Sequence, residues 1–337
     1  MKTQIASCFG SLLFAFSLSA QTAPLTAGDP IPLPGTTDGY DFIQFDSNGN
    51  RLLLGHEGNK SFDVYDLGSK KLTVVPTSTS QDAATDVKNH LYYVSGNDPG
   101  RLVIVNSKSL AVVGEVPVPS NVDLIGYDPQ TGLVHLCNDK AAEQWVIDPV
   151  AKKIVTTIKF DGTGMEDVAL DLKNRRLYQA VKGTSTIAQV DLDSHKILAA
   201  WPLAPDKGPH GIALVPGTDG LLVACASNLV LLSTSTGKVV ATAPIGARVD
   251  EMAYDPGLHM AYCASRVGKI SVIDVELDTT GSTGARLVRA DTLIPRGEVS
   301  DVTKTGDITV DPATHTVWIA YVKGDQCFAQ PFTPSQK

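Results

Sequence analysis

Residues 121–160 read NVDLIGYDPQTGLVHLCNDKAAEQWVIDPVAKKIVTTIKF, which is a series of four short apolar runs separated by turns. The first two runs, Leu124–Tyr127 and Leu133–Cys137, flank an Asp-Pro-x-x-Gly turn at Asp128–Gly132. The third run is Gln144–Ile147, and the alternating segment IVTTIKF follows a second turn. Runs of this length bounded by Asp, Pro and Gly are typical of β-strands joined by hairpins. We therefore predict that these residues form one four-stranded antiparallel sheet.

Similar units recur along the whole chain. They align on the residue that opens the first hairpin turn of each unit, which is Asp46, Asp86, Asp128, Asp171, Val215, Asp255 and Asp311. The spacings between these positions are 40, 42, 43, 44, 40 and 56 residues, and this period with four strands per unit is typical of propeller blades. One blade has apolar side chains on both faces and can bury both only between two neighbours. We therefore predict an all-β, seven-bladed β-propeller with four-stranded antiparallel blades.

The seventh unit lacks a fourth strand of its own. After Asp311 the sequence provides TVWIAYV and QCFAQPF, but no further apolar run follows. The stretch Pro30–Leu33 can supply the missing strand, and its prolines suit an edge position because they donate no ladder hydrogen bond. We predict that the last blade is completed by this N-terminal strand, with segment 21–38 closing the ring. The 56-residue step indicates an insertion in blade six at 276–291, whose Thr-, Gly- and Ser-rich tip is typical of an exposed loop.

The first twenty residues have the pattern of an export signal. Lys2 is followed by the apolar core Ile5–Leu18 and by small residues up to Ala20. A lipid anchor at Cys8 is the weaker alternative, since most of the apolar core follows that cysteine. We therefore expect a signal peptide at 1–20, a single propeller domain at 21–337, and an exported protein, periplasmic or secreted. We expect no membrane span, because the apolar run is too short for one.

The net charge and the cysteines exclude several classes of function. The chain carries a net charge of −8 at pH 7, and loss of the signal, whose only charged residue is Lys2, makes it −9. An acidic protein is a poor general binder of nucleic acid and of anionic lipid, so neither partner is expected. The remaining cysteines lie in apolar strand runs or late in the chain without a C-x-x-C pair, and we expect buried free thiols rather than disulfides in Cys137, Cys225, Cys263 and Cys327.

Two of the units carry a resemblance to a known family. The lines YDPGLHMAYCASRVGKISVIDV and YDPQTGLVHLCN…WVIDPVAKKIVTTI resemble the YVTN-type repeat. From about Gly39 to Pro334 the chain is similar to exported YncE-like seven-bladed propellers. The resemblance implies the fold but no particular reaction, because members of such families share a scaffold rather than one activity. The chain also departs from the pattern: the Asn that ends the second strand survives only as Asn97 or Asn138, and Val215 replaces the turn Asp in blade five.

The loops that enter the innermost strands point to a site at the mouth of the central channel. Four or five residues before each turn residue, the sequence has a ring of polar side chains: Asp41, Gln81 with Asp82, Asp123, Glu166 with Asp167, His210, Asp250 with Glu251, and Asp307. Crowded carboxylates raise one another's pKa unless a cation compensates. Carboxylate oxygens suit a hard divalent cation such as calcium, for which Glu166 and Asp250 are the candidate ligands. The alternative is structural: each Asp caps its own turn, and repetition in most blades favours this interpretation.

Residues that break the symmetry of the repeat are better candidates for a site. His210 replaces the Asp of other blades, His56 ends the second strand of blade one, and Arg266 has a comparable place in blade six. The candidate ligand-binding residues are therefore His56, Asp41, Asp123, Glu166, His210, Asp250 and Arg266. No catalytic residue is assigned, but His210 and Glu166 are candidates because a histidine beside a carboxylate can transfer protons or hold a metal. His90, His259 and His315 each follow a turn Asp by four residues and are interpreted as outer-turn residues.

The sequence leaves two interpretations of function open. The first is an exported, non-catalytic propeller, expected to be monomeric, that binds a protein, peptide or small ligand at the acidic, loop-rich face of the channel. The second is a hydrolase similar to propeller lactonases, which would use a metal-activated water or a His/carboxylate pair. A quinone- or haem-bearing propeller ranks last because the chain lacks attachment residues. The chain also has no G-x-S-x-G, H-E-x-x-H or phosphate-binding glycine loop.

Overall fold

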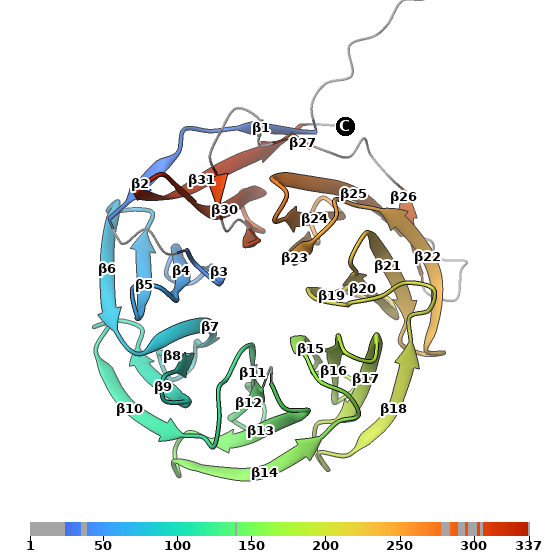
Figure 1. The fold of residues 1–337 in the computed structure, drawn as a ribbon, viewed down its shortest axis with the longest axis horizontal. Helices are drawn as coiled ribbons and strands as arrows, with labels where there is room; N and C mark the ends of the chain where they lie inside the picture. Colours follow the sequence, from blue (N-terminus) through green and yellow to red (C-terminus); the bar gives the residue numbers. More distant parts are fainter. Residues whose placement is uncertain are drawn as a thin grey trace, which may run out of the picture.

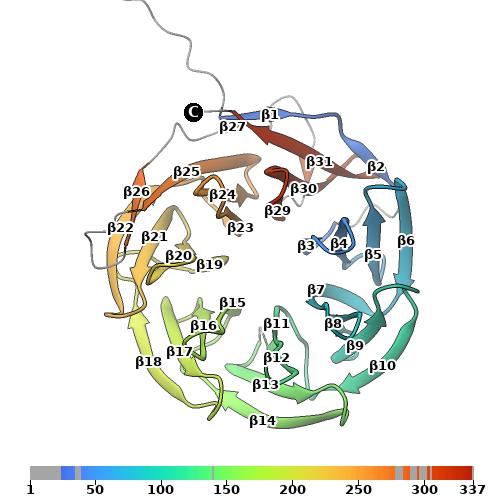
Figure 2. The same ribbon diagram turned by 180° about the vertical axis from the view of Figure 1, so that it is seen from behind.

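The protein is all-β, and its sheets form a ring of seven blades around a central channel (Figures 1 and 2). The computed structural model describes residues 24–34, 39–138, 140–277, 284–288, 294–295, 302–303 and 306–335. This part contains 31 strands and no helix. The predicted seven-bladed propeller is therefore confirmed. The predicted signal at 1–20 lies outside the described residues, as does most of the tip of the blade-six insertion.

Each blade is an antiparallel sheet whose strands follow one another from the channel outwards. Blades one and two are β3 (Phe42–Asp46), β4 (Arg51–His56), β5 (Ser61–Asp66) and β6 (Lys71–Pro76), then β7 (Thr79–Asp86), β8 (Leu91–Asn97), β9 (Arg101–Asn106) and β10 (Val112–Pro117). Blades three and four are β11 (Ile125–Asp128), β12 (Leu133–Asn138), β13 (Glu143–Asp148) and β14 (Lys153–Lys159), then β15 (Met165–Asp171), β16 (Arg176–Val181), β17 (Thr186–Asp191) and β18 (Ile197–Pro202). Blade five is β19 (Ile212–Leu214), β20 (Gly220–Ala224), β21 (Asn228–Ser233) and β22 (Lys238–Pro244).

Blade six differs from the others at its outer edge. It consists of β23 (Val249–Asp255), β24 (Met260–Ser265), β25 (Lys269–Leu277), β26 (Ala285–Val288) and β27 (Ile294–Pro295). Both β26 and β27 pair with β25, so two short segments share the place of the fourth strand. The described part of the predicted insertion, 276–277 and 284–288, lies at the outer edge of this blade. No helix in the described ranges is long and apolar enough to cross a membrane.

The last blade joins the two ends of the chain. Its strands are β28 (Val302–Thr303), β29 (Ile308–Asp311), β30 (Thr316–Lys323), β31 (Gln326–Pro334), β1 (Leu25–Ala27) and β2 (Ile31–Leu33). Both N-terminal strands pair antiparallel with β31, as Figure 1 shows. The predicted closure by Pro30–Leu33 is thus confirmed, and β1 lengthens it. Pro32 lies opposite Phe328 on this edge strand, where its missing N–H leaves no inner ladder bond unmade.

The core lies between neighbouring blades. Tyr93 and Ile104 of blade two pack in one cluster with Leu136 and Trp145 of blade three, and all four are buried. Each such aliphatic or aromatic side chain contributes about 1.5–3 kcal/mol when it is removed from water. Because neighbouring blades cover both faces in this way, a single isolated blade would expose apolar side chains to water on both faces. The four cysteines of the described chain are free and buried, as predicted.

The turn aspartates also link neighbouring blades. Each caps its own hairpin turn, as Asp128 does by accepting the N–H of Gln130 at 2.9 Å. Asp128 Oδ2 also accepts a hydrogen bond from Arg175 Nη2 of the next blade at 2.7 Å. Asp255 is contacted by His315 of blade seven at 2.8 Å, and both Arg175 and His315 stand four residues after the turn Asp of their own blade. This contact identifies a structural role for His315, which the sequence pattern had assigned only to an outer turn.

Candidate functional site at the channel mouth

The predicted mouth residues lie where the innermost strands begin, at one end of the ring. Asp41 directly precedes β3, while Asp123 and His210 each lie two residues before the start of β11 and β19. Glu166 and Asp250 are the second residues of β15 and β23. The loops between second and third strands reach the same end of each blade. These loops bring further side chains to the mouth, beyond those predicted from the entries to the innermost strands.

A polar cavity of about 430 Å³ opens at this end between blades one, two and three. It brings together the predicted residues Asp41 and Asp123. Its other carboxylates are Glu57 and Asp98, which come from the loops after β4 and β8. The one basic side chain among the lining residues is Lys140, and the rest are Thr79, Gln81, Asn97, Asn121 and Val122. Four carboxylates against one ammonium make the mouth cavity, as we call it, an acidic site.

Hydrogen bonds between blades fix the walls of the mouth cavity. Asn97 donates from Nδ2 to the carbonyl oxygen of Val122 at 2.8 Å and accepts the Val122 N–H at 2.6 Å. This pair of bonds ties the end of β8 to the segment that enters blade three. Gln81 of blade two donates to Asp41 of blade one at 2.7 Å. The cavity is therefore a preformed feature of the ring.

Asp41 is the carboxyl group whose electrostatics are most perturbed in the mouth cavity. The surrounding protein removes water from this half-buried group, and Glu57 and Asp250 add negative charge nearby. Together these effects raise the pKa of Asp41 to about 7, against the opposing influence of Arg266 and of the Gln81 bond. A cation bound in the cavity would reverse this shift. Asp41 is thus poised to lose a proton when positive charge arrives.

A second layer of carboxylates lies one residue further along the innermost strands and has a structural role. Asp82 is buried and accepts the N–H of Ala83 at 2.6 Å and that of Ile125, in the next blade, at 3.1 Å. Asp167 repeats this arrangement with Val168 at 2.7 Å and with Ile212 of blade five at 2.9 Å. These aspartates join one blade to the next. Asp82 and Asp167 therefore have a structural role, but they join neighbouring blades instead of capping their own turns as the sequence alternative had it.

Another buried carboxyl group, that of Glu251, lies on blade six. Burial raises the pKa of Glu251 well above its ordinary value, and the charges of Asp167, Asp250, Asp307 and Asp82 add to this effect. These carboxylates come from blades two, four, six and seven. The groups that act on Glu251 thus come from several sides of the channel, and burial favours the neutral form of its carboxyl group.

The two candidate metal ligands are each paired with a basic side chain of the protein. Glu166 lies 3.0 Å from Lys182 Nζ. Asp250 accepts from Arg266 Nε at 2.6 Å and also contacts the Nη2 group. Glu166 and Asp250 lie on blades four and six, with blade five between them. Within the described ranges, no group of three or more His, Cys, Asp and Glu side chains is arranged to hold a metal ion.

The two predicted histidines occupy different environments. His210 is half-buried at the mouth, and its Nδ1 lies 2.9 Å from the carbonyl oxygen of Gly208 in its own loop. His56 is fully buried, with Nδ1 2.8 Å from Asp63 and its ring 4.3 Å from that of Tyr40. Burial alone would lower the pKa of His56, but hydrogen bonds to Asp63 and Cys327 raise it to about 9. His56 thus joins blades one and seven and does not line the mouth cavity.

The sequence search missed Glu57, Asn97, Asp98 and Lys140 as members of one cavity. They lie in or beside the connections between second and third strands, whereas the search followed the entries to the first strands. The charged pair His56-Glu57 was visible in the sequence. Only the curvature of the ring shows that Glu57, rather than His56, faces the cavity.

Comparisons with known proteins agree on the fold. No model of a known protein family matches the chain. YncE of Salmonella typhi, described as an uncharacterized protein, is 29% identical over 189 residues, which is 54% of this chain and 52% of that protein. YncE of Salmonella typhimurium is 28% identical over 189 residues, again 54% of this chain and 52% of that protein. The chain therefore matches about half the length of these curated relatives.

Solved structures with other functions share the same architecture. A chain of Kuenenia stuttgartiensis hydrazine synthase has a TM-score of 0.72 at 15% identity, covering 86% of this chain and 94% of that chain. A chain of a mitotic checkpoint complex has a TM-score of 0.76 at 11% identity and covers 99% of both chains. At these identities the likeness shows the fold alone. The chain is therefore a seven-bladed β-propeller that is similar in sequence to YncE over about half of its length.

Proposed function

We propose that this protein is an exported, non-catalytic propeller that binds a positively charged ligand at its channel mouth. The ligand is a protein segment, peptide or small molecule with an amino or guanidinium group. Export is part of the proposal and rests on the signal pattern at 1–20. The assembly of a similar propeller chain in a mitotic checkpoint complex is in keeping with a binding role for this scaffold.

The observation that carries the proposal is the charge balance of the mouth cavity. Four carboxylates and one lysine line a preformed space of about 430 Å³, within the range that ligand sites usually occupy. Lys182 and Arg266 neutralise other carboxylates at this end of the ring, but their partners, Glu166 and Asp250, do not line this cavity. A cationic ligand would relieve the repulsion that raises the pKa of Asp41. Glu57 and Asp123 are the carboxylates best placed for direct contact, because both are half-buried in the cavity wall.

The hydrolase interpretation has less support. It requires a histidine beside a carboxylate or a group of metal ligands. His210 contacts the Gly208 carbonyl oxygen rather than a carboxylate, and Glu166 pairs with Lys182. The lactonase-like alternative therefore stays a prediction from the sequence.

The proposal is tested by calorimetric titration with two short peptides that differ only in charge. The probes are an acetylated, amidated pentapeptide of alternating glycine and lysine, and its counterpart with glutamate. We expect binding of the lysine peptide alone, weakened by added salt because the contacts are half-exposed. The double variant Glu57→Gln/Asp123→Asn should bind about tenfold more weakly, since each exposed charge pair contributes roughly 0.2–1 kcal/mol.

The control is Asp148→Asn, which removes one negative charge, against two in the double variant, at the β13–β14 turn at the opposite end of the ring. Asn at this position can still cap the turn, so folding and peptide affinity should both be unchanged. Equal binding of the two peptides, or equal loss of affinity in the control and in the double variant, would overturn the proposal.

A further inference from the structure

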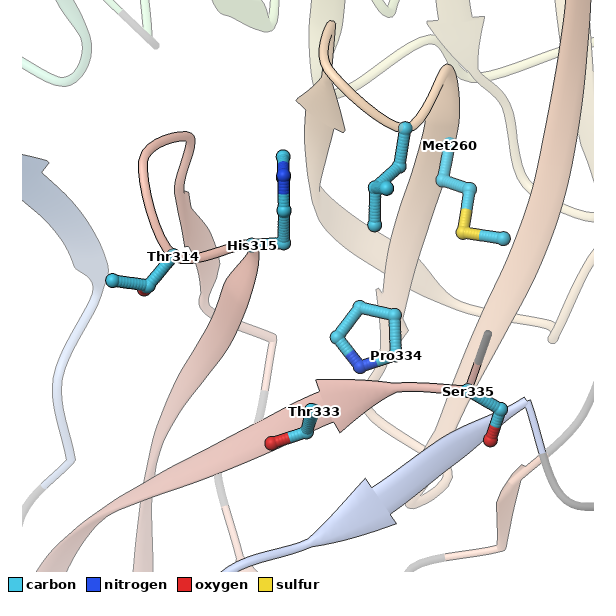
Figure 3. Close-up of a pocket in the computed structure, with 7 residues that line it drawn as sticks. Met260, Thr314, His315, Thr333, Pro334 and Ser335 are labelled. Carbon is cyan, nitrogen blue, oxygen red and sulfur yellow. The ribbon is translucent and has the colours of Figure 1, made fainter. Parts of the chain in front are cut away.

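A second cavity, of about 480 Å³, lies between blades six and seven at the end of the ring opposite the mouth. Leu258 and Met260 reach it from the β23–β24 turn of blade six, and His315 from the β29–β30 turn of blade seven. The end of β31, Thr333–Ser335, forms its floor in the view of Figure 3. Its size is in the usual range of small-molecule sites. We call it the blade 6–7 cavity.

The lining of the blade 6–7 cavity is mainly apolar. Leu258, Met260 and Pro334 contribute aliphatic surface, and Figure 3 shows Met260 across the cavity from His315. The Thr314 hydroxyl is engaged elsewhere, because it donates to Asp311 at 2.6 Å. Thr333 and Ser335 bring hydroxyl groups to the cavity, and His315 brings an imidazole ring. A cavity with an apolar wall and a few placed polar groups is the usual design of a small-molecule site.

The backbone and Asp255 hold the His315 ring in place. His315 has a φ of 62°, and its Nδ1 lies 2.8 Å from Asp255 Oδ2. Asp255 has no exposed surface, and its other oxygen accepts the N–H groups of Gly257 and Leu258 at 2.8 and 3.1 Å. A carboxylate held in this way is an acceptor, so Nδ1 carries the hydrogen and donates it. In the neutral ring, Nε2 then keeps a free lone pair and is a hydrogen-bond acceptor.

The equivalent pair between blades three and four shows that the link itself does not need a histidine. There Arg175 contacts Asp128 from the same turn position, and a guanidinium has donors but no acceptor. Blade seven has instead a ring with one nitrogen left for another partner. About a third of the His315 side chain is exposed (37%), so the ring is not enclosed by the fold.

We infer that the blade 6–7 cavity binds a small, mostly apolar molecule with one hydroxyl group that donates a hydrogen bond to His315 Nε2. A phenol with a short alkyl chain has this chemistry. The ligand would contact both blades and the last residues of β31. Ser335 donates its N–H to the carbonyl oxygen of Pro24 at 2.9 Å, so the site adjoins the ring closure. Binding would therefore stabilise the closed ring, because a ligand that binds only the folded state raises its stability.

The test compares three probes of nearly equal shape: 4-propylphenol, 4-propylanisole and propylbenzene. Binding to the full chain is measured by ligand-observed NMR titration and by thermal unfolding. We expect the phenol to bind about three- to tenfold more tightly than the other two, the effect of one hydrogen bond. The phenol should also raise the unfolding temperature in proportion to its occupancy.

Two variants and a control assign the effect to this cavity. His315→Asn can still donate to Asp255 and tolerates the left-handed backbone, so it should fold. Its amide oxygen is an acceptor but lies nearer the backbone than Nε2 does, so the variant should bind all three probes equally weakly. Leu258→Trp should fill the space and abolish binding of every probe. His90→Asn is the control, since His90 has the same turn position and a φ of 56° in blade two but does not line the cavity. No binding of any probe, equal affinity for phenol and anisole, or a phenol preference retained in His315→Asn would overturn the inference.

Discussion

Two layers of carboxylates on the innermost strands are one residue apart in sequence and have different roles. The second layer, seen in Asp82 and Asp167, bonds to backbone N–H groups of the next blade. The first layer, seen in Asp41 and Asp123, faces a cavity that the ring does not fill. The repeat thus places an acidic residue at nearly every strand entry, but only one of two adjacent positions is needed to hold the ring together. One repeated pair of positions can therefore supply both the bonds that join the blades and the carboxylates of a binding site.

The largest effect is expected where the second layer is removed. Asp82→Ala leaves the N–H groups of Ala83 and Ile125 without their acceptor in a buried place. Each orphaned group costs about 1–3 kcal/mol, so the free energy of unfolding should fall by about 2–4 kcal/mol in urea denaturation. Asp123→Asn, in the first layer, should change it by less than about 0.5 kcal/mol. Similar losses in both variants would remove the distinction between the layers.

A smaller effect, of opposite sign, is expected from Asp41. The pKa of Asp41 is raised to about 7 in the folded protein, above its ordinary value of 3.8. Its protonated form therefore stabilises the fold at low pH, and this contribution is lost as the pH rises from about 4 to 7. Asp41→Asn keeps an acceptor for Gln81 without the charge. The variant should be more stable than the original protein at pH 8, by about 1–2 kcal/mol after allowance for partial exposure, and no more stable at pH 4.

Thermal or urea unfolding at pH 4, 6 and 8 measures this difference. The same series on Asp148→Asn controls for loss of one negative charge from an acidic protein. If the stability difference between Asp41→Asn and the original protein is the same at pH 4 and at pH 8, the repulsion attributed to the mouth is absent.

Much of the fold could be predicted because each blade repeats the same local signals. The turn Asp, the apolar runs and the period of about 40 residues recur along the chain. The last blade lacks a fourth strand after Gln326–Pro334, so a strand from elsewhere, such as Ile31–Leu33, had to complete it. The second layer could not be recognised so directly. Asp82 lies beside Gln81 in sequence, and only the register of β7 shows which of the two bonds to the next blade.

The site was less predictable because its members come from different blades. Asp41 and Asp123 were expected at the mouth, but their association with Glu57 and Lys140 depends on how far adjacent blades are turned about the channel. His56, a predicted ligand-binding residue, is buried beside Asp63 and Cys327, and its place at the end of a strand does not reveal these contacts. The role of His315 depends on a contact 60 residues away in sequence.

The most direct test of cation binding at the mouth is the affinity for the lysine peptide, measured by calorimetry from pH 5 to pH 9. The original protein should bind more tightly as the pH rises to about 7 and then show a plateau, because Asp41 must lose its proton to meet the cation. Asp41→Asn should bind more weakly and with no such rise. The same pH dependence in both proteins, or no binding at any pH, would contradict the account.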